Sequence, residues 1–121
     1  MRSWYPIKAS SLDNKRLLAE HNEILIMAKA IHATKTNTKY GYKHHPETLR
    51  WTGHTKAMAL RHEELALEMK TRGFNHKSPW PDHLIDSLDT DGYPTTYWEP
   101  LEVMKSKLEE KQGGRLSKES I

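Results

Sequence analysis

Cysteine is absent from the 121-residue chain. This excludes disulfide bonds, thiolate metal sites and a cysteine nucleophile, and it suits a reducing compartment. Long apolar runs are absent too, since no stretch approaches the roughly 20 residues of a membrane-spanning helix. Residues 1–6 also lack the apolar core of a signal peptide. We therefore expect a soluble, cytoplasmic protein with no membrane partner.

Motifs for phosphate and metal binding are missing as well. The six glycines form no phosphate-binding loop, which argues against a nucleotide triphosphatase. The eight histidines form no H-E-x-x-H pattern: His62 is followed by Glu63, but the position of the second histidine holds Ala66. We expect neither a metal nor a cofactor.

Charge is unevenly distributed along the chain. Residues 1–77 contain 14 basic and 7 acidic side chains, a net charge of +7, whereas residues 78–121 contain 5 and 9, a net charge of −4. Because lysine and arginine neutralise phosphates, the basic part is a candidate nucleic-acid-binding surface. Ordinary solvated charge is the alternative interpretation.

Apolar residues recur at helical spacing in three stretches. The first helix is predicted over residues 12–33, capped by Ser10 or Ser11, and residues 34–46 read as a basic, aromatic loop. A second helix is predicted from Pro46 to Gly73, with an interruption at Gly53. Residues 74–98, rich in turn signals, are expected to wrap the helical core, and residues 99–111 to form the last helix.

These elements predict an all-α fold. One hydrophobic core suits this length, so we expect a single compact domain (residues 1–112) of three to four helices joined by long irregular connections. A flexible polar tail over residues 113–121 follows.

The first predicted helix carries a cluster of charged side chains. Arg16, Glu20 and Glu23 are separated by four and three residues, so they share one polar stripe. One interpretation is an acid/base or cation-stabilising carboxylate beside a phosphate-binding arginine. The other is a solvated intrahelical salt bridge.

The second cluster interleaves cations with aromatic rings. Seven lysines and arginines but only one acid, Glu47, lie between Lys29 and Arg61. Such a combination neutralises phosphates and offers rings on which a base can stack. Alternatively, Tyr42 and Trp51 pack over the core while the lysines stay in water. The cluster comprises Lys39, Tyr40, Gly41, Tyr42, Lys43, His44, His45, Pro46, Arg50, Trp51 and His54.

Residues 12–23, with a Leu-x-Ala-Glu-x-x-Glu run that ends at Glu23, resemble the first helix of the pyrimidine dimer DNA glycosylase family. That family is typified by an enzyme of T-even phages, in which the corresponding run ends in the catalytic glutamate. Residues 41–46 with Trp51, and then residues 72–74, resemble phage and bacterial relatives of that enzyme. The resemblance covers about the first hundred residues.

The resemblance implies a DNA glycosylase, with or without lyase activity at abasic sites. Such enzymes flip a nucleotide out of duplex DNA, and an amine then attacks the anomeric carbon of the sugar. It implies Glu23 as the catalytic carboxylate, with Arg16 and His45 at the reacting nucleotide or its phosphates. In the phage enzyme the nucleophile is the α-amine of a threonine exposed by loss of the initiator methionine. Here Arg2 follows Met1, so Met1 is expected to stay and to carry the amine, unless a side chain such as Lys15 supplies it.

The predicted DNA contacts follow from these clusters. We expect double-stranded, damaged or modified DNA as partner, bound by a monomer. The contacting residues are predicted to be Arg2, Lys15, His21, Lys39, Tyr42, Lys43, His44, Arg50, Trp51 and Lys56. Two alternatives remain: a non-catalytic DNA-binding or host-interacting phage protein, or a purely structural cluster formed by Arg16, His45 and Trp51.

Overall fold

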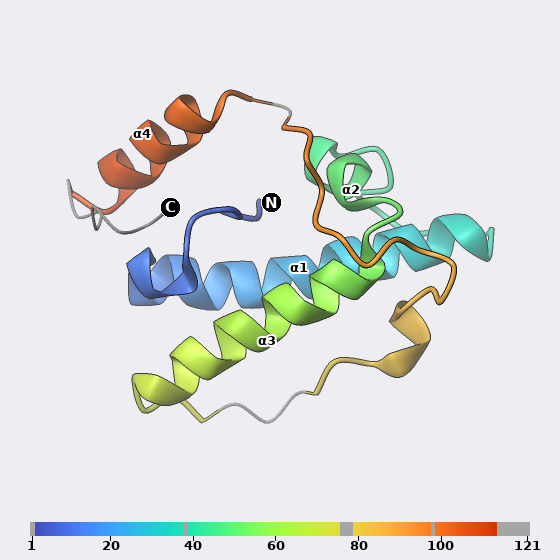
Figure 1. The fold of residues 1–121 in the computed structure, drawn as a ribbon, viewed down its shortest axis with the longest axis horizontal. Helices are drawn as coiled ribbons and strands as arrows, with labels where there is room; N and C mark the ends of the chain where they lie inside the picture. The colour runs from blue at the N-terminus through green and yellow to red at the C-terminus, as the bar shows by residue number, and fades with distance from the viewer. Residues whose placement is uncertain (1, 38, 76–78, 98, 114–121) are drawn as a thin grey trace.

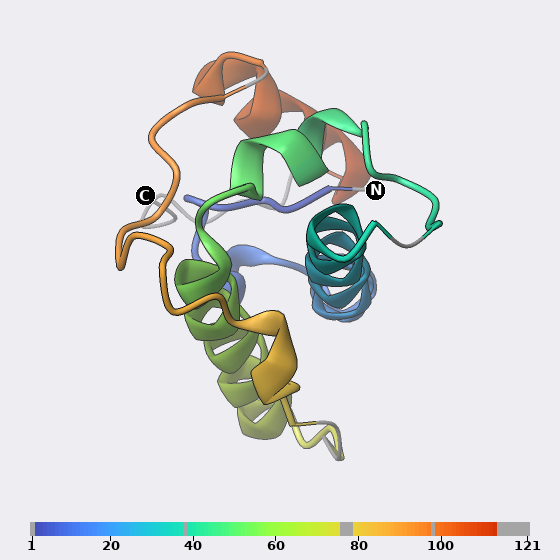
Figure 2. The ribbon, with the colours of Figure 1, turned by 90° about the vertical axis from the view of Figure 1, so that its right-hand side faces the viewer.

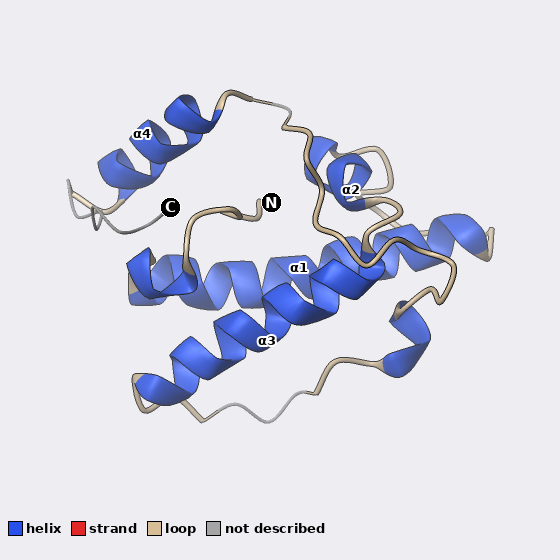
Figure 3. Cartoon of the chain, viewed as in Figure 1, coloured by secondary structure: helices blue, strands red, loops and turns tan. Residues whose placement is uncertain are grey.

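The structure, a computed structural model, describes residues 2–37, 39–75, 79–97 and 99–113. Within these ranges all regular secondary structure is helical (Figure 3), which confirms the all-α prediction. The elements in chain order are η1 (Ala9–Ser11), α1 (Asn14–Lys35), α2 (Pro46–Trp51), α3 (Thr55–Thr71), η2 (Asp82–Leu84) and α4 (Leu101–Lys111).

Helix α1 begins two residues later than predicted because its cap is different. The side chain of Asp13, not of Ser10 or Ser11, accepts the backbone N–H of Arg16 at 2.8 Å. An aspartate at this position satisfies one of the unpaired N–H groups of the first turn. The two serines lie instead in the short η1 turn.

The predicted second helix is divided into α2 and α3. Pro46 stands at the first turn of α2, where its missing N–H costs nothing. The break follows at Gly53, whose φ of +85° favours a glycine, so the predicted interruption is confirmed. Helix α3 ends before Gly73, also at positive φ, where the N–H of Phe74 bonds the carbonyl of Met69 at 2.9 Å.

The helices form two layers with an extended chain between them. Helices α1 and α3 pack against each other in one layer, and α2 and α4 lie across them (Figure 1). Residues 2–7, which we call the N-terminal segment, run between these layers (Figure 2). The core joins Leu17, Ile24, Ala28 and Ile31 of α1, the predicted apolar stripe, to Met58 and Leu65 of α3 and to Met104 and Leu108 of α4.

The chain after α3 wraps this core, as predicted for the residues that the structure describes. Leu84 of η2 packs into the core, and the ring of Tyr93 stacks on that of Tyr5 at 4.4 Å. No helix in the described ranges is both long and apolar enough to cross a membrane. The predicted tail lies outside the described residues except for Gly113.

Candidate active site

A cleft of about 470 Å³ opens between the N-terminal segment and one face of α1. Four elements contribute to it: the N-terminal segment, α1, the residue that caps α2, and the end of α4. Its lining residues are Arg2, Trp4, Lys15, Arg16, Ala19, Glu23, His45 and Lys111. We call this the basic cleft.

Glu23 lies in the basic cleft because of its helical register. Arg16, Ala19 and Glu23 are three and four residues apart, so they share one side of α1. The small side chain of Ala19 leaves room between the two charged ones. The backbone N–H of Arg2 donates to Oε2 of Glu23 at 2.9 Å. The structure therefore brings Arg16, Glu23 and His45 together with a main-chain nitrogen at the start of the chain.

The lining of the basic cleft carries more cations than carboxylates. Among its described lining residues, four are lysine or arginine and Glu23 alone is a carboxylate. Clustered positive charges favour the binding of a polyanion such as a phosphate backbone. The cations differ in their settings: Arg16 pairs with Asp13 at 3.7 Å, while Lys15 is exposed.

The side chain of Arg2 is held from two sides. Its guanidinium lies 4.6 Å from the ring centre of Trp4 and pairs with Glu99, which also binds Lys107 of α4 at 2.6 Å. Burial acts to raise the pKa of Glu99, but the hydrogen bonds from Arg2 and Lys107 outweigh it and lower the pKa below the ordinary value. The segment before α4 thus anchors one wall of the basic cleft.

His45 connects the basic cleft to the exposed loop before α2. Its Nδ1 accepts the N–H of Glu47 at 3.2 Å and caps α2, so a neutral ring carries its proton on Nε2. The ring of Tyr42 meets that of His45 edge-on at 6.5 Å. Tyr42 is 57% exposed and adopts a φ of +66°, which is uncommon for a residue with a side chain. The loop therefore places an exposed ring beside the basic cleft.

Comparison with known proteins assigns most of this architecture to one family. A family model described as pyrimidine dimer DNA glycosylase matches residues 1–82. The chain belongs to the pyrimidine dimer DNA glycosylase family. No curated protein and no solved structure matches it. The matched residues include the N-terminal segment and helices α1 to α3. Every residue that lines the basic cleft falls within the match except Lys111.

Membership of a DNA glycosylase family means that DNA is the expected substrate. Several residues predicted to contact DNA lie at or near the surface. Lys39 is exposed in the loop that also carries Tyr42. Lys43 and His44 line a neighbouring cavity of about 360 Å³ between α2 and the end of α1. Lys56, on α3, pairs with the exposed Asp91 at 3.1 Å. Met1 lies outside the described residues.

Three predicted DNA contacts are instead buried, which corrects the sequence analysis. Trp51 is fully buried among Tyr5 and Tyr93, so its ring is not available to stack on a base. Arg50 is 6% exposed and pairs with Glu47 at 3.1 Å. His21 packs against His62, with 4.6 Å between ring centres. Their helical register turns all three side chains towards the core.

Glu20 departs most clearly from its predicted place. It shares α1 with Glu23, but it is fully buried, and Arg61 of α3 binds both of its oxygens, at 2.7 and 2.9 Å. Burial acts to lower the pKa of Arg61, but Glu20 and then Glu64 outweigh it and raise the pKa. The expected stripe of one guanidinium and two carboxylates is thus divided between cleft and core.

Three lining residues of the basic cleft, Trp4, Ala19 and Lys111, were not among the predicted site residues. Trp4 and Lys111 approach from the two ends of the chain, more than a hundred residues apart, so spacing gave no signal for their meeting.

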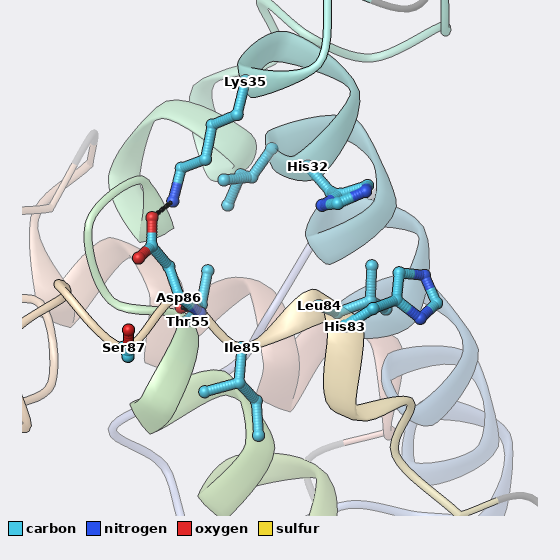
Figure 4. A pocket seen from close by; sticks show the side chains of 9 residues that line it. His32, Lys35, Thr55, His83, Leu84, Ile85, Asp86 and Ser87 are labelled. Atoms are coloured by element: carbon cyan, nitrogen blue, oxygen red, sulfur yellow. Dashed lines mark hydrogen bonds and ion pairs between the residues drawn. The ribbon is translucent and has the colours of Figure 1, made fainter.

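A separate cavity of about 280 Å³ lies between the end of α1 and the η2 region (Figure 4). Its lysine, Lys35, is paired with Asp86 and lies 3.7 Å from Asp89. His32 and His83 meet edge-on at its other side, with ring centres 5.2 Å apart. In the described ranges no three histidine or carboxylate side chains are grouped so as to hold a metal ion.

Proposed function

We propose that this protein is a DNA N-glycosylase that acts at C1′ of a damaged or modified nucleotide flipped out of duplex DNA. The observation that carries the proposal is the contact between Glu23 and the backbone nitrogen of Arg2 inside a cleft lined by four lysines and arginines. One carboxylate among many cations is an arrangement that can bind phosphates and still stabilise a cationic sugar.

The chemistry assigned to Glu23 is electrostatic and acid–base. When the base leaves with the electron pair of the C1′–N bond, positive charge develops on the sugar, and a nearby carboxylate stabilises it. An amine then forms a bond to C1′ and loses a proton, which Glu23 can accept. The C1′–O4′ bond then breaks while the nitrogen lone pair forms a C=N bond, and O4′ takes up a proton to become a hydroxyl on C4′. Strand cleavage by elimination would follow from this ring-opened imine.

The start of the chain is the proposed source of the amine. If the chain begins at Arg2, its α-amine is the nitrogen that contacts Glu23. If Met1 is retained, the amine belongs to the residue joined to that nitrogen. An α-amine has an ordinary pKa of about 7.7 to 8.0, so a useful fraction is unprotonated near neutral pH. The side chain of Lys15, in the same cleft, is the alternative source of the attacking amine.

DNA is proposed to lie over the basic cleft and the loop before α2. Arg16, His45 and Lys111 would contact the reacting nucleotide or its phosphates. Lys39 and Lys43 would bind the backbone beside Tyr42, whose exposed ring would stack on an unpaired base. Burial favours a supporting role for Trp51 and Arg50 beneath this surface.

Borohydride trapping tests the proposal. The protein is incubated with duplexes that carry a pyrimidine dimer, another modified base or an abasic site, and the reduced imine is detected as a covalent complex. We expect a trapped complex for the wild type and for Glu63→Gln, which replaces an exposed glutamate on α3. We expect little trapped complex for Glu23→Gln. Mass spectrometry of the trapped peptide and of the intact chain identifies the amine and the first residue.

Absence of base release and of a trapped complex on every duplex would overturn the enzymatic proposal. Salt-dependent DNA binding that Glu23→Gln leaves unchanged, without chemistry, would then support the non-catalytic DNA-binding alternative.

A further inference from the structure

Three successive backbone N–H groups of the N-terminal segment each donate to a glutamate. The N–H of Arg2 bonds Glu23, that of Ser3 bonds Glu47, and that of Trp4 bonds Oε1 of Glu20 at 2.8 Å. The three acceptors come from two helices, α1 and α2. Glu23 opens on the basic cleft, whereas Glu20 and Glu47 are fully buried.

Each buried glutamate is paired with a buried arginine that binds the same segment. Arg50 pairs with Glu47 and donates to the carbonyl of Tyr5 at 2.8 Å. The pair therefore binds the N–H of Ser3 and the carbonyl two residues later. Arg50 also donates to the carbonyl of Thr96 at 3.1 Å, which ties the chain before α4 to the same point.

The second pair makes a similar arrangement, with its N–H one residue and its carbonyl two residues further along the chain. Glu20 accepts the N–H of Trp4, and its partner Arg61 donates to the carbonyl of Ile7 at 2.9 Å. Glu20 also accepts the hydroxyl of Ser3 at 2.9 Å. The two pairs thus hold a segment that has neither helical nor sheet hydrogen bonds of its own.

Stability alone does not explain two buried ion pairs. Removing charges from water is costly, and well-packed apolar residues of similar volume often serve a fold as well or better. A buried pair does, however, restrict its hydrogen-bond partners to one geometry. At the N-terminal segment, the partners held in this way are the N–H groups of Ser3 and Trp4, which directly follow the nitrogen of Arg2 along the chain.

We propose that Glu47–Arg50 and Glu20–Arg61 are positioning pairs that hold the start of the chain against Glu23. Neither pair contacts the substrate; each acts through the N-terminal segment. The effect of these pairs on catalysis rests on the proposed function, whereas their effect on the position of the Arg2 nitrogen does not. The competing interpretation is that the pairs only satisfy buried backbone groups and that Arg2 would remain at Glu23 without them.

Glu47→Gln is the most informative variant. It keeps the shape of the side chain and one acceptor oxygen but removes the charge that pairs with Arg50. Glu68→Gln is the control, because Glu68 of α3 forms an ion pair with Arg72, the residue after the helix, at 3.5 Å, rather than with an arginine that binds the N-terminal segment. Glu20 is less suitable because it also joins α1 to α3.

The first readout is the NMR signal of the Arg2 amide, measured on the chain that retains Met1. Mass spectrometry checks that Met1 is present. An amide bonded to a carboxylate changes its chemical shift as that carboxylate takes up a proton, so the Arg2 signal should follow Glu23 and lose this response in Glu23→Gln. We expect Glu47→Gln to lose at least about half of the response and Glu68→Gln to keep it. A folded Glu47→Gln variant with the full response would overturn the proposal.

The second readout is catalytic. Because misplacement by about 1 Å can cost about 100-fold in rate, we expect the rate of imine trapping by Glu47→Gln to fall at least tenfold while its dissociation constant for DNA stays within about twofold. If the affinity for DNA and the trapping rate fall by the same factor, or if neither falls, the proposed effect of the pairs on catalysis is overturned. If the wild type shows no chemistry, the proposed function fails, and the Arg2 signal still decides the positioning.

A measurement on the wild type covers the case in which Glu47→Gln does not fold. Hydrogen exchange should show the amides of Ser3 and Trp4 protected at least about 100-fold relative to an unstructured peptide, although they lie near the chain end. Exchange at the rate of an unstructured peptide would overturn the proposal by itself.

Discussion

Glu20 and Glu23 lie one turn apart on α1 and accept backbone N–H groups two residues apart in the N-terminal segment, yet one is in the core and the other in the basic cleft. Trp4 donates to Glu20, and Arg2 donates to Glu23. The two carboxylates of this helix therefore lie in different environments. We expect substitution of Glu20 to lower stability, and substitution of Glu23 to act directly on the proposed chemistry.

Glu20→Ala should destabilise the protein strongly. It leaves the guanidinium of Arg61 buried without its main partner, and loss of one member of a buried ion pair costs about 3–5 kcal/mol. Urea unfolding followed by circular dichroism measures the change. Glu63→Ala, at an exposed site on the neighbouring helix, should stay within about 0.5 kcal/mol of the wild type. Similar unfolding midpoints for the two variants would contradict the role given to Glu20.

Tyr42→Ala should weaken DNA binding without changing stability. The ring is largely exposed beside His45, and a lost base stack costs about 1–3 kcal/mol of binding free energy. Fluorescence anisotropy with a damaged duplex measures the affinity, and thermal unfolding checks the fold. Tyr42→Phe should bind like the wild type, as should Leu88→Ala at a fully exposed position. Wild-type affinity for Tyr42→Ala would remove the ring from the interface.

Trp51→Ala should show the opposite pattern. Because Trp51 is fully buried between the N-terminal segment and the chain after α3, its truncation should lower the unfolding free energy by about 3–5 kcal/mol. The milder Trp51→Phe variant, compared at equal concentrations of folded protein, should bind DNA as the wild type does. A selective loss of affinity in folded Trp51→Phe would restore the direct contact suggested by the sequence.

Lys111→Ala tests whether α4 takes part in DNA binding, since this residue lies outside the family match. Each phosphate contact contributes about 0.9 to the slope of log affinity against log salt concentration. We expect Lys111→Ala to reduce that slope by roughly this amount, and Lys70→Ala, exposed on α3, to leave it unchanged. Identical slopes for Lys111→Ala and the wild type would remove Lys111 from the DNA interface.

Glu99 gives the protein a defined dependence on acid pH. Its pKa is lowered in the folded state from an ordinary value of 4.5, so its contribution to stability is complete above that value and is lost as the pH falls below 4.5 through the folded pKa. The difference in unfolding free energy between the wild type and Glu99→Gln should be constant above about pH 5.5 and shrink below pH 4.5. A difference that grows on acidification would contradict the assigned ion pairs with Arg2 and Lys107.

Much of the helical framework could be predicted because its signals are local. The apolar stripe from Leu17 to Ile31, the proline that opens α2 and the glycines that end helices each act within one or two turns. The cap of α1 was assigned to the wrong residue because Ser10, Ser11 and Asp13 are all competent caps. Only the path of the preceding chain selects among them.

The candidate site was predicted less completely because burial is a property of the whole fold. Arg16, Glu23 and His45 do share one cleft. Arg50 and Trp51, however, carry the residue types of a DNA-binding surface, and their burial depends on the N-terminal segment and the chain before α4, which pack over them. Sequence spacing within one helix contains no information about which distant segments will pack over its side chains.

The sequence by itself determined an all-helical chain, a basic N-terminal part and a glutamate whose surrounding motif resembles that of the pyrimidine dimer DNA glycosylases, because periodicity, composition and short motifs are written in neighbouring residues. Only the tertiary structure decided that Glu23 faces a cleft while Glu20 joins the core, and that the start of the chain meets both. The physical reason is that a segment outside helix and sheet must take most of its hydrogen-bond partners from whichever helices pack around it.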